Sequence, residues 1–392
     1  MATIAMTSLD KVQGAFSSKF GGKPAVVARA PGRVNLIGEH TDYNGGFVFP
    51  MAISRQTLVA AGPSDGTSID VQSVQFREAD SFAPGASEKA GGSWRDYVRG
   101  VVAIADKLGY RARPCKLLVD GDVPLGSGLS SSAALEVAVF GALDAFNGWD
   151  LPKMDIAKLA QRAENDFVGV NCGIMDQLVS VFGQEDCALF VDCRSLEFRA
   201  IPLHLAENGV QVAILDSEVP RTLATAGYNE RRAQCEEGVE LLSKALGRQL
   251  DALRDVSEVE FAAHQDALPM PIRARVRHVV SENSRVLRAV TALESGDVAE
   301  FGQLMDRSHQ SLRDDYEVSC EELDLLVALA RKVPGVLGAR LTGAGFGGCA
   351  VALVRSDALS HLQQALADYM RQTGLTPTIW LCDAASGASR LL

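Results

Sequence analysis

The eleven residues from Arg33 to Tyr43 bring together one cation, two carboxylates, an imidazole and a phenol. Such groups are costly to bury without partners, so most of them should face water or a polar ligand. The carboxylates of Glu39 and Asp42 suit sugar recognition, because each accepts two or more hydrogen bonds from hydroxyl groups. A metal site at Glu39, His40 and Asp42 is an alternative, although this spacing matches no common ligand pattern. The density of polar groups argues against a merely solvated loop.

Two more acids could serve chemistry. Asp176 lies in an otherwise apolar segment, 171–177, just after a glycine. It could cap a helix, or it could orient a substrate hydroxyl while a nearby Arg33 holds it ionised. Glu164 falls on a helix expected from Met154 to Val168 and by itself has the pattern of an ordinary surface residue.

A loop rich in glycine and serine, 124–134, leads into a helical pattern from Ala133 to Phe146. Gly126 and Gly128 have no Cβ, so the backbone there can turn sharply and approach a bulky anion. Ser130 to Ser132 place hydroxyl and N–H groups where the helix begins, and these N–H groups lack intrahelical partners at the positive end of the helix dipole. The pattern predicts a phosphate cradle; a serine-rich helix cap explains it nearly as well.

Gly343, Gly345 and Gly348 have the G-x-G-x-x-G spacing of dinucleotide-binding proteins. That fingerprint should follow a strand and open a helix. Here a strand-like segment, 349–354, follows, so a Rossmann site is disfavoured. A Walker phosphate loop is also excluded, because no Gly-Lys-Ser/Thr sequence follows Gly126.

Composition limits the class of protein. The 392 residues suggest two domains, and the net charge of −11 argues against a nucleic-acid surface. No apolar run is long enough to cross a bilayer, and no secretory signal is visible at the N-terminus. None of the eight cysteines forms a Cys-x-x-Cys pair, which argues against a zinc site or a disulfide framework. We therefore expect a cytoplasmic protein with small-molecule partners and neither nucleic acid nor membrane among them.

The elements needed to position these residues mix strands and helices. The expected strands are 25–28 (interrupted by Pro31-Gly32), 47–49, 57–60, 188–191, 210–215, two around the Gly343 loop, and 376–381. The expected helices are 8–20, 94–108, 133–146, 154–168, 173–182, 229–246, 271–293, 298–312, 321–333 and 359–373. This order predicts an α+β fold, with a domain boundary near Leu196 to Gly209.

Together these motifs resemble a known family. Residues 30–44 resemble the galactokinase signature, which is highly specific. Residues 125–134 and 341–348 resemble the second and third motifs of the galactokinase–homoserine kinase–mevalonate kinase–phosphomevalonate kinase (GHMP) superfamily. Three further stretches are similar to galactokinases in particular: 171–177, 227–232 and 311–317. The resemblance runs in one order from about Val26 to Val354.

The resemblance implies a two-domain GHMP-kinase-like fold, with domains at 1–200 and 201–392 and the active site in the cleft between them. It also implies transfer of the γ-phosphoryl group of ATP to the anomeric hydroxyl of α-D-galactose, giving α-D-galactose 1-phosphate and ADP. That reaction is the first committed step of galactose catabolism in the Leloir pathway.

The same resemblance assigns roles to residues. The catalytic carboxylate would be Asp176, with Arg33 beside it. The sugar would be bound by Glu39, His40, Asp42, Gly173, Asp176 and Tyr228. The nucleotide would be bound by Trp94, Tyr97, Gly126, Ser127, Gly128, Leu129, Ser130, Ser131 and Ser132, although aromatic residues at helical spacing, such as Trp94 and Tyr97, are usually core residues. Ser132 and Glu164 would hold Mg²⁺.

Two alternatives remain open at this stage. The protein could phosphorylate a related sugar, such as N-acetylgalactosamine, arabinose or galacturonate. It could also be a non-catalytic galactose sensor, but such relatives have a shortened serine loop, whereas 130–134 is complete here and Arg33, Glu164 and Asp176 are all present. A monomer or a weak homo-oligomer is expected.

Overall fold

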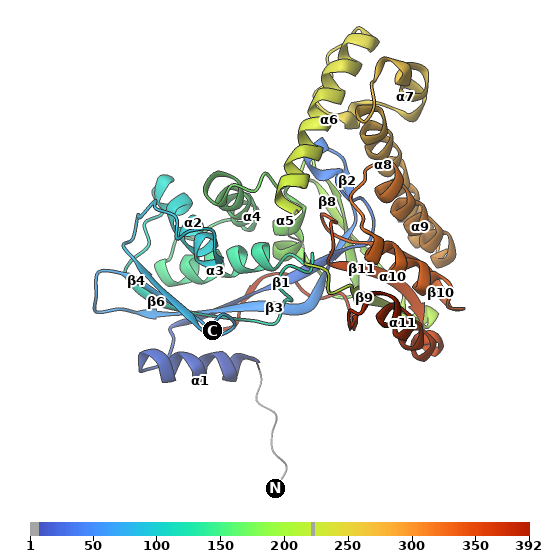
Figure 1. The fold of residues 1–392 in the computed structure, drawn as a ribbon. Coiled ribbons are helices and arrows are strands. Elements are labelled where there is room, and N and C mark those ends of the chain that lie inside the picture. The colour runs from blue at the N-terminus through green and yellow to red at the C-terminus, as the bar shows by residue number, and fades with distance from the viewer. Residues whose placement is uncertain (1–7, 221–223) are drawn as a thin grey trace.

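The computed structural model describes residues 8–220 and 224–392 (Figure 1). Its largest sheet has six strands in the order β13-β1-β3-β6-β4-β5. All neighbours are antiparallel except β4 and β6, which are parallel. The strands are β1 (Val26–Asn35), β3 (Pro50–Pro63), β4 (Ile69–Ser73), β5 (Glu78–Phe82), β6 (Cys115–Gly121) and β13 (Ser389–Arg390).

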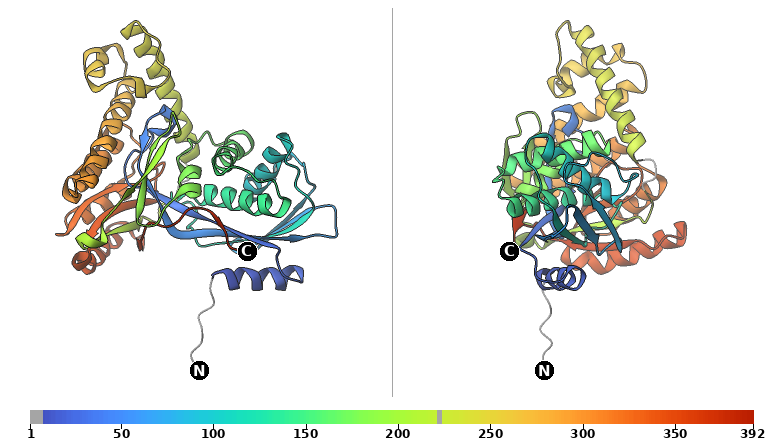
Figure 2. Two further views of the ribbon diagram at one scale, coloured as in Figure 1. Left: turned by 180° about the vertical axis from the view of Figure 1, so that it is seen from behind. Right: turned by 90° about the vertical axis from the view of Figure 1, so that its left-hand side faces the viewer.

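Helices cover both faces of this sheet (Figure 2). On one face lie α2 (Trp94–Lys107), α3 (Ser131–Asn147), α4 (Lys153–Arg162) and α5 (Met175–Phe182). On the other face lies α1 (Ser8–Phe20), whose buried Val12 and Phe16 pack against Leu58 and Leu118. The helix expected over 154–168 ends its α-helical part at Arg162 and continues as a π-helical turn, Ala163–Val168. A π-helical turn of this kind is frequent at functional sites.

A second sheet has four antiparallel strands in the order β10-β11-β9-β12. These strands are β9 (Val210–Asp216), β10 (Val336–Leu341), β11 (Cys349–Arg355) and β12 (Thr378–Cys382). One face packs against α10 (Glu321–Arg331) and α11 (Leu359–Thr373). A third sheet of three strands joins β2 (Phe47–Val48), β7 (Cys187–Asp192) and β8 (Phe198–Pro202).

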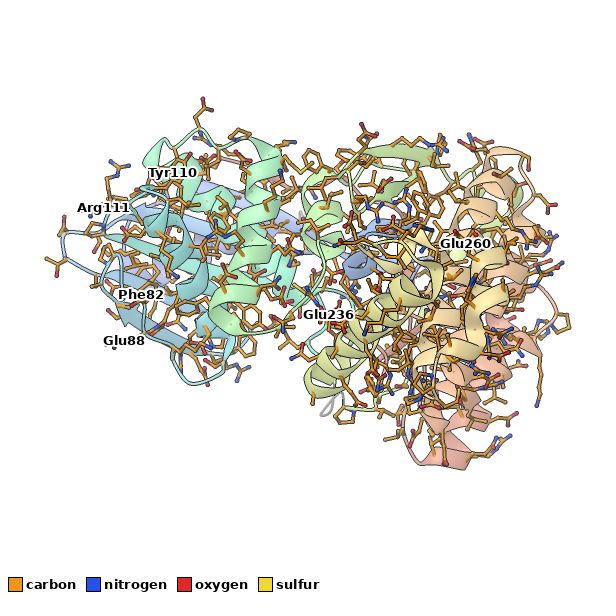
Figure 3. The ribbon with its side chains drawn as sticks, turned by 90° about the horizontal axis from the view of Figure 1, so that it is seen from above. Phe82, Glu88, Tyr110, Arg111, Glu236 and Glu260 are labelled. Carbon is orange, nitrogen blue, oxygen red and sulfur yellow. The ribbon has the colours of Figure 1, made fainter. Side chains whose placement is uncertain are left out.

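Four helices make up the remaining part. They are α6 (Ala224–Leu246), α7 (Glu258–His264), α8 (Ile272–Glu294) and α9 (Val298–Asp314). Of these, α6 and α7 project beyond the sheets, whereas α9 packs on the second sheet (Figure 1). Seen from above, Phe82 and Tyr110 lie in one half of the molecule and Glu260 of α7 in the other, with Glu236 of α6 between them (Figure 3). The mixture of strands and helices confirms the expected α+β class.

The predicted interruption at Pro31-Gly32 is wrong, because β1 continues to Asn35 with a shift of register between Pro31 and Arg33. Glycine is required at this point, since a Cβ on Gly32 would lie 2.7 Å from the carbonyl oxygen of Leu129. The strand thereby passes directly under the serine loop and brings Arg33 to it.

The last residues of the chain return to the first sheet. Strand β13 pairs with β1, and Ala384 bridges to Ile53 of β3. One apolar cluster also joins residues from both halves, among them Phe49 and Val351, each fully buried. A division of the chain near residue 200 remains a prediction. No helix in residues 8–220 and 224–392 is long and apolar enough to cross a membrane.

Candidate active site

A cleft with a cavity volume of about 320 Å³ collects most of the residues singled out in the sequence. The predicted residues that line it are Arg33, Glu39, His40, Asp42, Tyr97, Gly126, Gly128, Ser130, Ser131, Ser132, Glu164, Gly173, Asp176 and Tyr228. They come from segments far apart in the sequence, so the fold concentrates the motifs in one place.

At the centre of the cleft, Arg33 of β1 forms an ion pair with Asp176 in the first turn of α5. The Nε atom of Arg33 donates to Oδ1 of Asp176 at 2.8 Å, and Nη2 donates to Oδ2 at 2.7 Å. Such a bidentate pair fixes the orientation of the two side chains relative to each other. Burial opposes the charge of Arg33, but the carboxylates of Asp176 and Glu39 outweigh this effect, so the pKa of Arg33 lies above its usual value.

The serine loop is built to face the cleft rather than to cap its own helix. Ser130, the residue before α3, has a left-handed backbone with φ of 60° and makes no side-chain cap bond. Its hydroxyl instead donates to Oδ2 of Asp176 at 2.5 Å. Left-handed backbone in a residue other than glycine is costly and tends to persist at functional sites. The alternative of a simple serine cap is therefore disfavoured.

The first and third glycine-rich motifs meet at this loop. Nη1 of Arg33 donates to the carbonyl oxygen of Gly128. A Cβ on Gly343, at φ of 82°, would come within 3.0 Å of the same oxygen. The strand β11 begins directly after the third motif, which confirms that this motif does not open a Rossmann helix. The glycines of this motif instead allow its backbone to lie close to other segments, as Gly343 does to Gly128.

The carboxylate of Glu39 is held by the third motif. Its Oε1 atom accepts hydrogen bonds from the backbone N–H of Gly343 at 2.7 Å and from Oγ1 of Thr342 at 3.2 Å, and Nη1 of Arg340 lies 3.5 Å away. Within residues 8–220 and 224–392, every hydrogen bond to this carboxylate goes to Oε1. The Oε2 atom is therefore left for a ligand in the cleft.

Asp42 and Gly173 both line the cleft and lie in direct contact with each other. Asp42 opens a short 3₁₀ turn, Asp42–Asn44, and an ideal Cβ on Gly173 would lie only 1.8 Å from its Oδ2. The position therefore needs glycine for the Asp42 carboxylate to keep its place.

We expect Gly173→Ala to raise the KM for the sugar by about tenfold or more, because the added methyl group displaces the Asp42 carboxylate and weakens one charged hydrogen bond. The KM for the nucleotide should stay unchanged. Steady-state kinetics with each substrate varied in turn will measure this. Gly14→Ala, in α1 with no heavy atom within 4 Å of the added methyl group, is the matched control. Equal effects of the two variants on the sugar KM would contradict the assignment.

Burial raises the pKa of Asp42 from 3.8 to about 7, and the nearby charge of Asp176 adds to the shift. A carboxyl with a raised pKa in the folded state stabilises the ligand-free protein fully below about pH 4, and this contribution is lost as the pH rises through about 7. A sugar hydroxyl that donates to the anion should therefore favour loss of this proton.

We accordingly expect sugar affinity to rise from about pH 6 to about pH 8, with proton release on binding at the lower end, because the Asp42 pKa is about 7. Isothermal titration calorimetry in two buffers of different ionisation enthalpy will measure both quantities. In Asp42→Asn the profile should become flat. A profile that keeps its shape in this variant would assign the proton to another group.

Glu164 lies in the π-helical turn and is 6% exposed, so the expectation of an ordinary surface residue was wrong. Burial raises the pKa of this carboxyl to about 7, and Asp176 adds to the shift. Nε2 of Gln177 donates to its Oε2 at 2.8 Å, and Sγ of Cys172 lies 3.5 Å from the same atom. Within the described residues, no group of three or more His, Cys, Asp or Glu side chains could hold a metal ion.

The structure does not bring three predicted nucleotide residues to the lining of the cleft. Trp94 is buried in the core, stacks on Phe76 with ring centroids 5.7 Å apart, and donates from Nε1 to Glu78. The Ser127 hydroxyl donates to a backbone carbonyl in its own turn, and Leu129 is fully buried. None of these three side chains lines the cavity.

Five further residues line the cleft: Val170, Cys172, Met175, Gly343 and Ala344. Gly343 and Ala344 belong to the third motif, 341–348, whereas no role is predicted from the sequence for Val170, Cys172 and Met175. Another missed residue is Glu136 of α3, which is fully buried and whose pKa is raised well above its usual value by burial and by Glu164. A lone acid in an apolar helix was the signal that could have found it.

Three family models match the chain. Residues 14–63 match the galactokinase galactose-binding signature, 96–184 the GHMP kinases N terminal domain, and 289–372 the GHMP kinases C terminal domain. The galactokinase of Roseiflexus sp. (strain RS-1) is 48% identical, with 99% of this chain and 98% of the relative covered. That of Chloroflexus aggregans is 49% identical, with 98% of both chains covered.

Two solved structures are also similar to this chain. The crystal structure of Lactococcus lactis galactokinase complexed with galactose has a TM-score of 0.93 at 37% identity, covering 98% of this chain and 100% of that chain. The Methanococcus jannaschii mevalonate kinase shares the fold, with a TM-score of 0.66 at 18% identity, covering 93% and 99%.

Proposed function

This chain belongs to the galactokinase family of GHMP kinases, and we propose that its cleft transfers the γ-phosphoryl group of ATP to the anomeric hydroxyl of α-D-galactose. The enzyme class is that of a sugar kinase, and its fold is the two-domain GHMP kinase fold. The observation that carries the proposal is the bidentate Arg33–Asp176 pair between the serine loop and the carboxylates of the sugar signature.

Asp176 is the group that receives the sugar hydroxyl. Its Oδ2 atom accepts from Arg33 and Ser130, whereas Oδ1 accepts from Arg33 alone. A carboxylate oxygen accepts about two hydrogen bonds, so Oδ1 keeps a position for the anomeric hydroxyl. Arg33 holds the carboxylate in place through two hydrogen bonds and lies where it offsets charge on the transferred group. Because phosphoryl transfer has a loose transition state, positioning and electrostatics supply most of the catalysis.

Substrate binding divides between two sides of the cleft. Glu39, His40, Asp42 and Tyr228 face the sugar, with the backbone of Gly173 close to Asp42. On the other side, the N-terminus of α3 with its loop receives the phosphates, and Tyr97 lines the cavity beside them. Ser127 and Leu129 belong to this loop, whereas Trp94 lies in the core beside Phe76.

The residues also fit a magnesium ion. Mg²⁺ prefers oxygen ligands and usually takes one or two carboxylates together with substrate phosphates. Glu164 and Ser132 offer a carboxylate and a hydroxyl on the phosphate side. Burial raises the pKa of Glu164 to about 7, and a cation beside it would favour the ionised carboxylate. When bound, the ion would neutralise charge on the phosphate oxygens. Glu164 is itself held in place by Gln177.

We also propose a cytoplasmic site of action and a monomer or weak homo-oligomer. Eight free thiols are typical of reducing compartments.

The test is release of ADP with Mg-ATP across a panel of sugars: galactose, 2-deoxygalactose, galactosamine, N-acetylgalactosamine, glucose, arabinose and galacturonate. Strong release with galactose and weak release with glucose are expected, since a buried acceptor left unpaired by an inverted hydroxyl penalises the wrong sugar. Turnover that is highest with another sugar would assign that sugar as the substrate in place of galactose. Binding of galactose and ATP without any turnover would make the protein a sensor.

A further inference from the structure

A chain of hydrogen bonds leads away from the cleft behind His40. Nδ1 of His40 lies 2.8 Å from the hydroxyl of Tyr43, which lies 2.7 Å from the hydroxyl of Tyr316. The Tyr316 hydroxyl in turn lies 3.1 Å from Sγ of Cys235. The chain thus connects the sugar signature with the segment after α9 and with the middle of α6.

For a neutral His40 imidazole, the chemistry of the groups fixes the direction of this chain. Nε2 of His40 lies 3.3 Å from the carbonyl oxygen of Ala344, which can only accept, so Nε2 carries a hydrogen. In a neutral imidazole the other nitrogen, Nδ1, must then accept, and Tyr43 is its donor. Because Tyr43 has one hydrogen, Tyr316 must donate to Tyr43, and for the same reason Cys235 must donate to Tyr316.

Burial keeps these donors protonated. Tyr316 is 0% exposed, Cys235 1% and His40 4%. Burial raises the pKa of both phenols well above the usual value and that of the Cys235 thiol to about 11. The rings are also packed together, with centroids of His40 and Tyr316 4.8 Å apart. No member of the chain can easily turn away.

We propose that Tyr43, Tyr316 and Cys235 are positioning residues that hold His40 in its Nε2–H tautomer, so that the Nε2–H group, which lies 3.3 Å from the Ala344 carbonyl oxygen without sugar, donates to a sugar hydroxyl in exchange for that long contact. The inference rests on the proposed sugar site. It gives the cleft a specific polarity, because the carboxylates of Glu39 and Asp42 accept, whereas Nε2 of His40 donates. A hydroxyl placed among them donates one hydrogen bond and accepts another. A deoxy sugar that lacks this hydroxyl can do neither.

The first test reads the tautomer without any catalysis. We would record ¹⁵N NMR spectra of the full chain with labelled histidine rings, at about pH 7.5 and without sugar, and assign His40 by comparison with His40→Gln. The shifts of the neutral Nε2–H form are expected. An Nδ1–H ring or an imidazolium would overturn the proposal. In Tyr43→Phe and Tyr316→Phe the signals should move toward a mixture of tautomers.

The second test is kinetic. Tyr316→Phe should raise the KM for galactose by about tenfold, the effect of one lost orienting hydrogen bond, while kcat and the KM for ATP change less than about twofold. Tyr369→Phe is the matched control. Tyr369 lies on α11, is equally buried, and donates from its hydroxyl to the Ser217 carbonyl oxygen at 2.7 Å. Equal effects of the two variants on the galactose KM would overturn the positioning role. Failure of the proposed function would look different: the parent itself would show no galactose-dependent ADP release, while the NMR spectra would still report the tautomer.

Discussion

Asp176→Asn is expected to lower kcat by about a hundredfold or more, the range of a lost general base, while the chain stays folded and still binds galactose. The amide that replaces the carboxylate cannot accept a proton from the sugar hydroxyl. It also places an N–H group against Arg33, which donates to both carboxylate oxygens of the parent. The measurement is kcat for ADP release, with galactose binding followed separately by calorimetry.

A matched control separates the chemistry from the loss of an ion pair. Asp80 makes the same bidentate contact with Arg99, at 2.8 and 2.7 Å, on β5 and α2. Neither Asp80 nor Arg99 lines the cleft. Asp80→Asn should lower the melting temperature and leave kcat unchanged. If Asp176→Asn retains near-normal turnover, or if Asp80→Asn slows the reaction equally, Asp176 is not the catalytic carboxylate.

The difference between predicted and observed site residues has a physical cause. Residues that the sequence placed in polar, glycine-rich stretches, such as Glu39 and Ser130, do line the cleft, because polar groups and glycines at that density rarely pack into a core. Trp94 does not line this cavity, and its contact with the nucleotide stays a prediction, because an aromatic residue at helical spacing gives the same pattern whether it faces a core or a ligand. The burial of Glu164 was not predictable either, because no local sequence pattern distinguishes a buried acid on a helix from a solvated one.

The fold was predictable where periodicity is strong. The helices α1 (Ser8–Phe20) and α11 (Leu359–Thr373) begin and end where the apolar pattern places them. The interruption of β1 was not predictable, because the need for Gly32 comes from Leu129, almost a hundred residues away. The return of the C-terminal residues to β1 is likewise a long-range pairing that no local pattern encodes.

The charges of the cleft explain why its acids behave unusually. Arg33 faces the carboxylates of Asp176, Glu39 and Asp42, and Arg340 adds a second cation beside Glu39, so carboxylates outnumber cations here. The pKa values of Asp42 and Glu164, each raised by burial and then by Asp176, express this excess of negative charge. Hydroxyl donors from a sugar and a cation at the phosphates would both relieve it. Ligand binding should therefore stabilise the protein more at about pH 8 than at about pH 6, on either side of these pKa values.

Glu39→Gln is expected to raise the KM for galactose by roughly tenfold to a hundredfold, since a hydrogen bond to a charged acceptor contributes about 1.5–3 kcal/mol. In the parent, Oε1 is occupied by the N–H of Gly343, so the glutamine must place its oxygen there. Its amide nitrogen then replaces Oε2 in the cleft, and an acceptor becomes a donor. The KM for ATP should not change, because the nucleotide lies on the other side of the cleft. Steady-state kinetics will show the separation.

A set of deoxygalactoses turns this prediction into a direct reading of the contact. If Glu39 accepts from one particular hydroxyl, the sugar lacking that hydroxyl should lose affinity in the parent and lose no more in Glu39→Gln, since the same bond cannot be lost twice. The other deoxy sugars should show additive penalties. Additive penalties for every sugar would mean that Glu39 only supports the third motif through Gly343 and Thr342. In that case the selectivity for galactose must come from Asp42 and His40.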